Sequence, residues 1–223
     1  RGIYSEIEVR STLAYPKTLI LTSSVPQEGK SQLSCNLAAV FASHKRKTLL
    51  VDCDLRRPTL HRYFGLKVDT GWVDWIEQPA AERNEIPTGI INMGENFDLL
   101  PAGRMPSNPT EVLDRLANRA IIEPLLKAYD LVIFDTPPVG IFPDAVLLAR
   151  SCHEAVFVCR YRTVRLGPAC KNIDRLHEAG IVVLGVVLNQ LPEAKARAYG
   201  YEGYGAQAEG YYRAYKSEEK NQD

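Results

Sequence analysis

The stretch that decides the fold is Ser24-Val-Pro-Gln-Glu-Gly-Lys-Ser31. It follows an apolar run over residues 18–22 that predicts a β-strand, and it opens a run with helical spacing at Lys30. A loop in this position that ends in Gly-Lys-Ser is typical of a P-loop, whose backbone N–H groups point at a phosphate held at the helix N-terminus. Ser24 replaces the first glycine of G-x-x-x-x-G-K-[ST], but strand, loop and helix occur in the required order.

The residues of this loop predict how a nucleotide is held. Lys30 can reach the β- and γ-phosphates, and the Ser31 hydroxyl can ligate Mg²⁺. The neighbouring Glu28, Gly29 and Gln32 complete the predicted nucleotide-binding stretch. The expected cofactors are therefore ATP and Mg²⁺. The alternative is a chance turn before a helix.

Two carboxylates follow the next predicted strand, in Leu49-Leu-Val-Asp-Cys-Asp-Leu-Arg-Arg-Pro58. Because strand side chains alternate, Asp52 and Asp54 can point the same way from the carboxyl end of the strand, where open α/β sheets bind ligands. Two adjacent anions favour a cation, and Mg²⁺ beside a P-loop meets that need. The alternative is a solvated turn with a salt bridge to Arg56 or Arg57.

A further acidic residue ends the apolar strand in Leu131-Val-Ile-Phe-Asp-Thr-Pro-Pro138. The two prolines forbid continuation of the strand. Asp135 therefore matches the Walker B role, in which an aspartate holds Mg²⁺ directly or through water. Together with the P-loop and the aspartate pair, it predicts a nucleotide site.

Short apolar runs alternate with helical segments along the chain, which predicts an α/β fold: a P-loop NTPase-type, mostly parallel sheet flanked by helices. We expect helices over Lys30–His44, over Pro109–Ala128 with Asn108 as its N-cap, and over Leu166–Ala179. Strands are expected over residues 18–22, 48–52, 97–100, 131–135, 155–159 and 182–188.

The composition changes beyond Pro192. Residues 1–191 are predicted to form the P-loop domain, with a helical segment over 1–17, whereas 192–223 mix glycine with Tyr, Ala and Glu and keep no period. We expect this second part to be a flexible, tyrosine-rich C-terminal tail, because a core is not built from tyrosines without other large apolar side chains. It holds six of the chain's 11 tyrosines: Tyr199, Tyr201, Tyr204, Tyr211, Tyr212 and Tyr215.

The charge balance excludes a polybasic protein. With 27 Lys+Arg against 27 Asp+Glu, the formal charge is zero, which argues against general affinity for nucleic acid or anionic membrane. No apolar run approaches the roughly 20 residues that span a bilayer. The five cysteines lack C-x-x-C spacing and favour buried thiols in a reducing compartment. Because the chain begins at Arg1, we expect it to be a piece of a longer protein.

These motifs together resemble those of the bacterial tyrosine kinases (BY-kinases), P-loop proteins that regulate polysaccharide synthesis and export. The resemblance covers nearly the whole chain. It implies an ATP- and Mg²⁺-dependent protein-tyrosine autokinase that phosphorylates its own tail tyrosines. It is carried by residues 22–31, 51–58 and 134–138, by Leu100-Pro-Ala-Gly-Arg-Met-Pro-Ser-Asn-Pro109 and by the tail.

The resemblance also implies a role for each motif residue. Lys30 and Ser31 would serve the phosphates and Mg²⁺, and Asp54 and Asp135 would organise the metal. Asp52 would lie closest to an incoming tyrosine hydroxyl as general base, although this first carboxylate can equally belong to the metal shell.

Partners and location follow from the same resemblance. They are other copies of the chain phosphorylated in trans, a membrane activator segment or fused transmembrane region, and a tyrosine phosphatase, with no nucleic acid. The domain would lie in the cytoplasm at the inner face of the bacterial plasma membrane, through a missing N-terminal region or a partner. Asn189, after the last strand, would contact the adenine by comparison with related P-loop proteins.

Two departures from the family pattern concern assembly and the P-loop. Family members often carry a Glu-x-x-Arg-x-x-Arg helix that assembles a ring of subunits. In this chain the corresponding stretch is Tyr4-Ser-Glu-Ile-Glu-Val-Arg10, which keeps only the last arginine and argues against assembly of that ring. Gln27 stands where the family usually has glycine, and its Cβ limits backbone freedom without removing a phosphate contact.

Two other functions compete with a kinase. A MinD/ParA-type ATPase switch would share the fold, but such proteins usually carry an early lysine followed by Gly-Gly, where this chain has Val25, Pro26 and Gln27. The tail also has no evident use in such a switch. A nucleotide-binding regulatory module without phosphotransfer is the other alternative, with the tyrosines as aromatic contacts for a partner.

Overall fold

The computed structural model describes residues 2–11, 14, 17–79, 81–82, 85–192 and 195. The chain divides into two units, Arg1–Asn189 and Gln190–Asp223. The six tail tyrosines that the sequence singles out lie outside the described residues, so the flexible tail and its boundary after residue 191 stay predictions.

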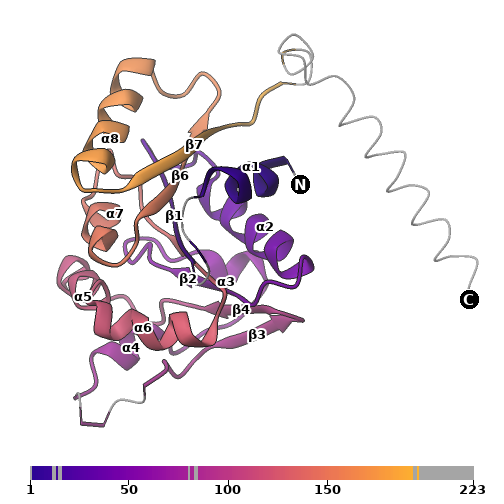
Figure 1. The fold of residues 1–223 in the computed structure, drawn as a ribbon. Helices are drawn as coiled ribbons and strands as arrows, with labels where there is room; N and C mark the ends of the chain where they lie inside the picture. Colours follow the sequence, from indigo (N-terminus) through magenta and orange to yellow (C-terminus); the bar gives the residue numbers. More distant parts are fainter. Residues whose placement is uncertain are drawn as a thin grey trace, which may run out of the picture. The chain divides into compact units, whose positions relative to one another are not determined.

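A seven-stranded sheet forms the centre of the first unit, in the order β3-β4-β2-β5-β1-β6-β7 (Figure 1). Every neighbouring pair is parallel except β3 and β4, which confirms the mostly parallel sheet. The sequence misses only β3, because this strand alternates half-buried with exposed residues and carries little apolar signal. The strands are β1 Lys17–Ser23, β2 Thr48–Asp52, β3 Ile91–Gly94, β4 Phe97–Leu100, β5 Leu131–Asp135, β6 Glu154–Arg160 and β7 Val182–Asn189.

Helices cover both faces of the sheet, with α1 and α2 on one side and α5, α7 and α8 on the other (Figure 1). Among the described residues, no helix is long and apolar enough to cross a membrane. The helices are α1 Gly2–Arg10, α2 Lys30–Ser43, α3 Leu60–Tyr63, α4 Trp72–Ile76, α5 Pro109–Leu116, α6 Arg119–Ala128, α7 Asp144–Leu147 and α8 Leu166–Glu178, with a 3₁₀ turn at Leu148–Arg150.

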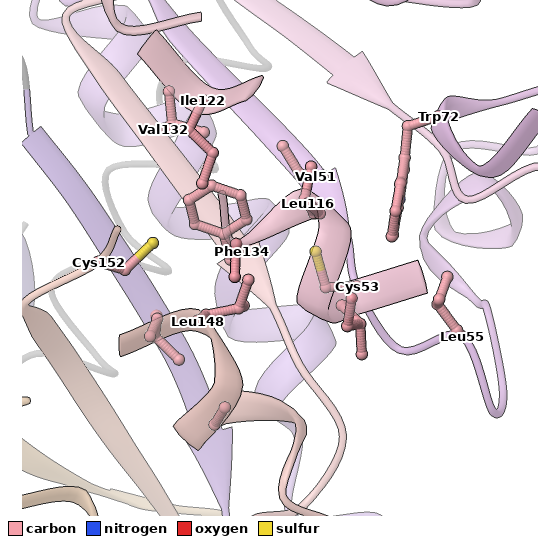
Figure 2. Packing of buried hydrophobic residues seen from close by; sticks show 14 of the residues in the cluster. Val51, Cys53, Leu55, Trp72, Leu116, Ile122, Val132, Phe134, Leu148 and Cys152 are labelled. Atoms are coloured by element: carbon pink, nitrogen blue, oxygen red, sulfur yellow. The ribbon is translucent and has the colours of Figure 1, made fainter. Parts of the chain in front are cut away.

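The core is split into two clusters because successive strand side chains point to opposite faces of the sheet. Val132 and Phe134 of β5 belong to the cluster that also holds side chains of α5 and α6 (Figure 2), whereas Ile133 belongs to the cluster under α2. Such doubly covered strands read as continuous apolar runs, which is why the sequence reveals them clearly.

The predicted helix over Pro109–Ala128 is wrong in one respect, because the structure ends α5 at Leu116 and starts α6 at Arg119. The side chain of Asn118 accepts a hydrogen bond from the Ala120 N–H at 3.0 Å and caps a new helix. Asn108 is confirmed as the N-cap of α5, with its Oδ1 accepting from the Glu111 N–H.

The expectation of buried thiols holds for only part of the cysteines. Cys35, Cys53 and Cys152 are buried and Cys159 is half-buried, but Cys170 is exposed on α8. Cys170 follows Ala169, which packs into the core, so its own side chain faces outward.

Candidate active site

The sheet order brings the predicted motifs together. Strand β5 lies between β2 and β1, so the residues that follow these three strands meet at one edge of the sheet. Asp52 at the end of β2 is in register with Asp135 at the end of β5, and Asp135 is in register with Leu21 of β1, three residues before the P-loop. The site therefore lies at the carboxyl ends of the parallel strands, as expected for an open α/β sheet.

Lys30 is the cation at the centre of this site. Its Nζ lies 2.9 Å from Asp54 Oδ2 and 3.3 Å from Ser31 Oγ. Burial by itself lowers the pKa of this lysine, but Asp135 and Asp54 together raise the pKa above its ordinary value. Lys30 is thus held fully charged at the start of α2, where a phosphate would lie.

Asp135 has one buried oxygen that accepts no hydrogen bond from the described residues. Its Oδ1 accepts a hydrogen bond from Ser34 Oγ at 2.9 Å, whereas Oδ2 has no hydrogen-bond partner among the described residues. Burial raises the pKa of this carboxyl, and the charge of Lys30 together with the Ser31 and Ser34 hydroxyls only partly offsets that effect. A buried carboxylate oxygen without a partner calls for an explanation, and a Mg²⁺ ion or one of its waters would supply the missing contact.

The described residues hold no cluster of three or more metal-ligating side chains. A Mg²⁺ ion that binds together with a nucleotide does not need such a cluster, because it keeps several waters and takes one or two carboxylates plus phosphate oxygens. Its residues in this chain stay a prediction.

Asp52 is fully buried and folds the following loop back onto the strand. Its Oδ1 accepts from the Asp54 N–H at 3.2 Å, and its Oδ2 accepts from the Thr59 and Leu60 N–H groups at 3.1 and 3.0 Å. Burial and then the nearby Asp135 raise the pKa of Asp52 to about 8. The general-base role of Asp52 stays a prediction, and its visible role is to shape the loop that presents Asp54.

Glu28 has a role that the sequence does not reveal. Its buried carboxylate accepts hydrogen bonds from two backbone N–H groups, that of Val25 at 2.9 Å and that of Arg160 at 3.0 Å. The side chain therefore ties the P-loop to the end of β6. A contact of Glu28 with a nucleotide, which stays a prediction, would have to use its backbone.

Asn189 contacts the P-loop from the end of β7. Its Nδ2 donates to the Glu28 carbonyl at 2.9 Å, and a Cβ at Gly29 would lie 2.0 Å from that same nitrogen. Gly29 is therefore favoured by its φ of +88°, and a Cβ there would displace the Asn189 amide from its contact with Glu28. The adenine contact predicted for Asn189 stays a prediction.

Gln27 adopts the left-handed conformation, with φ of 64°. Glycine reaches this region without steric penalty, whereas a residue with a Cβ costs roughly 1–2 kcal/mol. The structure therefore gives a physical reason why glycine suits this position, and it shows that the loop takes its shape with glutamine in place.

Arg56 joins the loop after β2 to two distant helices. Its guanidinium contacts the buried Asp144 at 3.1 and 3.3 Å and Thr110 at 3.2 Å, and it lies 4.0 Å from the centre of the Phe142 ring. The alternative of a solvated turn with a salt bridge to Arg56 or Arg57 is wrong, because Asp52 and Asp54 are buried. The salt bridge that Arg56 forms is with Asp144 at the start of α7, not with the aspartate pair.

The Leu-Pro-Ala-Gly stretch after β4 braces the same edge of the sheet. The carbonyl of Pro101 accepts from the Trp72 N–H at 3.1 Å, and the Trp72 indole donates to the Asp52 carbonyl at 2.8 Å. A Cβ at Gly103 would lie 2.4 Å from the Gly71 nitrogen, so only glycine allows this approach. The motif thus anchors α4 behind the aspartate pair.

The brace formed by Glu28 predicts a stability change. Replacing Glu28 by Ala leaves the Val25 and Arg160 N–H groups, whose hydrogen bonds are part-buried, without their acceptor. Water can reach these groups in part, so Glu28→Ala should lower the free energy of unfolding by roughly 1–3 kcal/mol in urea titrations. Glu28→Gln keeps one acceptor oxygen and should lose about half as much. Equal, negligible losses in both variants would contradict the brace.

The buried carboxylate of Asp135 predicts a gain in the free energy of unfolding on substitution, opposite to the loss expected for Glu28. Because burial raises the pKa of Asp135, its charged form is unfavourable in the folded chain, so Asp135→Asn should raise the free energy of unfolding of the nucleotide-free chain at neutral pH. The same variant should lose most of the stabilisation that ADP with Mg²⁺ gives the wild-type chain. Asp69→Asn changes an exposed aspartate in the same way and should alter neither quantity. A destabilised Asp135→Asn chain that still responds to Mg²⁺ would refute this prediction.

The chain matches known proteins over most of its length. The family model described as an AAA domain matches residues 27–153. The chain is 32% identical over 203 residues to the tyrosine-protein kinase YwqD of Bacillus subtilis, covering 91% of this chain and 84% of that protein. It is 34% identical to the putative tyrosine-protein kinase CapB of Staphylococcus aureus, covering 90% and 87%. It spans only 28% of the tyrosine-protein kinase Wzc of Salmonella typhimurium, at 34% identity.

Solved structures give the same grouping. The chimerical protein CapA2B2 superposes with a TM-score of 0.76 at 32% identity, covering 86% of this chain and 83% of that one. The kinase domain of Escherichia coli ETK gives 0.72 at 32% identity, covering 80% and 69%. The MinD protein of Pyrococcus horikoshii gives 0.65 at 23% identity, covering 82% and 76%, which shows the shared fold alone. The chain therefore belongs to the bacterial tyrosine-protein kinase family that includes YwqD and CapB.

Proposed function

We propose that this chain is an ATP- and Mg²⁺-dependent protein-tyrosine kinase that phosphorylates tyrosines of its own C-terminal region and regulates exopolysaccharide or capsule synthesis or export. The observation that carries the proposal is the meeting of the charged Lys30, Asp54 and the unpartnered Asp135 oxygen at the start of α2. This arrangement of side chains supports a phosphate-transfer activity for this chain more specifically than the fold alone does, because proteins of this fold have many functions.

The proposed nucleotide contacts follow from the P-loop. Backbone N–H groups from Gly29 to Gln32 would face the phosphates, and Lys30 would neutralise the β- and γ-phosphates. Ser31, Asp54 and Asp135 would hold Mg²⁺, which supplies charge neutralisation for the transferred phosphoryl group. The 2.9 Å contact between Lys30 and Asp54 supports this set, because it shows that both side chains reach one point beside the P-loop.

Asp52 is the proposed general base for the acceptor tyrosine. A tyrosine hydroxyl is protonated at neutral pH, and a positioned base contributes roughly 10²–10⁴ in rate. The position of Asp52 at the end of β2, next to Asp54 and Asp135, supports this role. A place in the metal shell is the alternative for the same carboxylate, and positioning with Mg²⁺ electrostatics should contribute more than the base.

The proposed partners are other copies of the chain, a membrane activator segment or fused transmembrane region, and a tyrosine phosphatase. The proposed location is the cytoplasmic face of the bacterial plasma membrane. Arg10, the one arginine kept from the family's ring helix, pairs with Glu6 on α1 at 2.8 Å. This arginine is therefore engaged within α1. The proposed reaction is transfer between two copies of the chain, and it does not depend on a ring.

The mass of the purified chain tests the proposed activity. After incubation with ATP and Mg²⁺, the intact mass should rise by several phosphates, located between Tyr199 and Tyr215. Lys30→Met should abolish the gain, whereas Lys67→Met, at an exposed lysine, should leave it unchanged. No gain in the wild-type chain, even with an activator segment added, would overturn the proposal, and ATP hydrolysis without phosphotransfer would point to an ATPase switch.

The same assay separates phosphorylation in cis from phosphorylation in trans. The Lys30→Met chain is mixed with an active chain whose six tail tyrosines are replaced by phenylalanine. Phosphate on the Lys30→Met chain would establish transfer between chains, and its absence would restrict the reaction to one chain.

A further inference from the structure

A hollow of about 410 Å³ lies beside the P-loop and has no part in the proposed nucleotide contacts. Its volume falls within the roughly 300–1,000 Å³ of small-ligand sites. Three segments form its wall: the first residues of the P-loop, the loop after β5, and the stretch from the end of β6 into α8. The lining residues are Ser24, Val25, Gly140, Ile141, Val164, Gly167, Pro168, Lys171 and Asn172.

The third of these segments is strongly basic in a chain of zero net charge. Residues 160–175 contain five Lys and Arg residues and a single acid, Asp174, giving +4. All five basic side chains are exposed, and none forms an ion pair with another described residue. The basic residues are Arg160, Arg162, Arg165, Lys171 and Arg175. Unpaired cations gathered on one segment raise the local concentration of an anionic ligand.

The wall of the hollow combines an apolar part with this charge. Val25, Ile141 and Val164 offer aliphatic surface, and Ile141 is 51% exposed. Lys171 brings an ammonium group into the lining. Arg175 is fixed next to the hollow, because its Nη1 donates to the Val139 carbonyl at 3.0 Å.

The polar part of the wall is held in place by the P-loop. Asn172 Nδ2 donates to Ser24 Oγ at 3.1 Å, so α8 and the first P-loop residue are directly linked. A Cβ at Gly140 would lie 2.3 Å from the Ser24 carbonyl, which shows how closely the loop after β5 approaches the same residue. The hollow is therefore a built feature of the fold that shares Ser24 and Val25 with the nucleotide loop.

A ligand that matches this wall needs an aromatic or aliphatic body and a dianionic group. We infer that the hollow and the basic segment 160–175 bind phosphotyrosine, the product of the reaction, and hold a phosphorylated segment next to the active site. The inference rests on the proposed function for the origin of its ligand. Phosphotyrosine carries a ring for the aliphatic wall and about −1.5 to −2 charges for the cations.

Holding one phosphotyrosine has a consequence for the tyrosines that follow. Six tyrosines lie between residues 199 and 215, so a segment anchored by one phosphotyrosine always carries other tyrosines within a few residues. While one phosphotyrosine is bound, the next tyrosine of the segment stays near the active site at a high effective concentration and does not have to meet it again by diffusion. The basic hollow would therefore favour phosphorylation of several tyrosines on one segment over phosphorylation of a single tyrosine on each of many segments.

Binding of synthetic peptides to the full-length, unphosphorylated chain tests the inference without any phosphotransfer. The probe is a fluorescent peptide of residues 207–215 with phosphate on Tyr211, measured by anisotropy with saturating ADP and Mg²⁺ so that the P-loop is filled. We expect it to bind more tightly than the same peptide without phosphate and than a peptide with phosphoserine at that position. Lys171→Gln or Arg165→Gln should weaken it roughly fivefold to tenfold, and Lys67→Gln should not.

Three results would overturn the inference: equal binding of the unphosphorylated peptide, equal binding of the phosphoserine peptide, or insensitivity to Lys171→Gln and Arg165→Gln. Loss of binding when ADP and Mg²⁺ are added would also overturn it, because the phosphate would then have occupied the P-loop. A chain that binds the peptide as predicted but gains no mass with ATP would refute the proposed kinase activity and leave the phosphotyrosine site standing.

Discussion

Three carboxylates buried around one lysine are the constraint on which the rest of this structure depends. Asp52, Asp54 and Asp135 meet because β5 lies between β2 and β1, and Lys30 is the cation that faces them. Burying like charges together is unfavourable unless a cation and fixed dipoles compensate them. The surrounding contacts serve that end: three N–H groups satisfy Asp52, and Trp72 and Arg56 hold the loop that carries the pair.

The parts of the site that lie next to one another in sequence could be predicted, and the long-range contacts could not. The P-loop and the three aspartates could be predicted because each directly follows or ends an apolar run that is typical of a buried strand. The partners of Glu28 and Arg56 lie 132 and 88 residues away, and the order of the strands, which periodicity does not reveal, brings them close. The break between α5 and α6 at Asn118 could not be predicted for another reason. The apolar pattern of the sequence does not distinguish an asparagine that caps a helix from an asparagine within a helix.

The two ends of the P-loop take part in different features. At its end, Lys30 contacts Asp54 among the buried carboxylates, where we propose that a nucleotide binds with Mg²⁺. At its start, Ser24 and Val25 line the basic hollow. The zero net charge of the chain thus conceals a division between an acidic site and a basic segment of +4. Gln27 shows that the loop keeps its shape without a glycine at this left-handed position, at a modest cost in backbone energy.

The pH dependence of unfolding tests the carboxylate crowding most directly, when the wild-type chain is compared with Asp52→Asn. Because the pKa of Asp52 is raised from 3.8 to about 8, the folded chain binds this proton more tightly than the unfolded chain does. Without nucleotide, the wild-type chain should therefore lose stability relative to the variant as the pH rises from about 4 to about 8, by up to roughly 1.4 kcal/mol per pH unit. ADP with Mg²⁺ should flatten that difference. A wild-type chain that gains stability relative to Asp52→Asn over this range, or a slope that Mg²⁺ and ADP leave unchanged, would contradict the account.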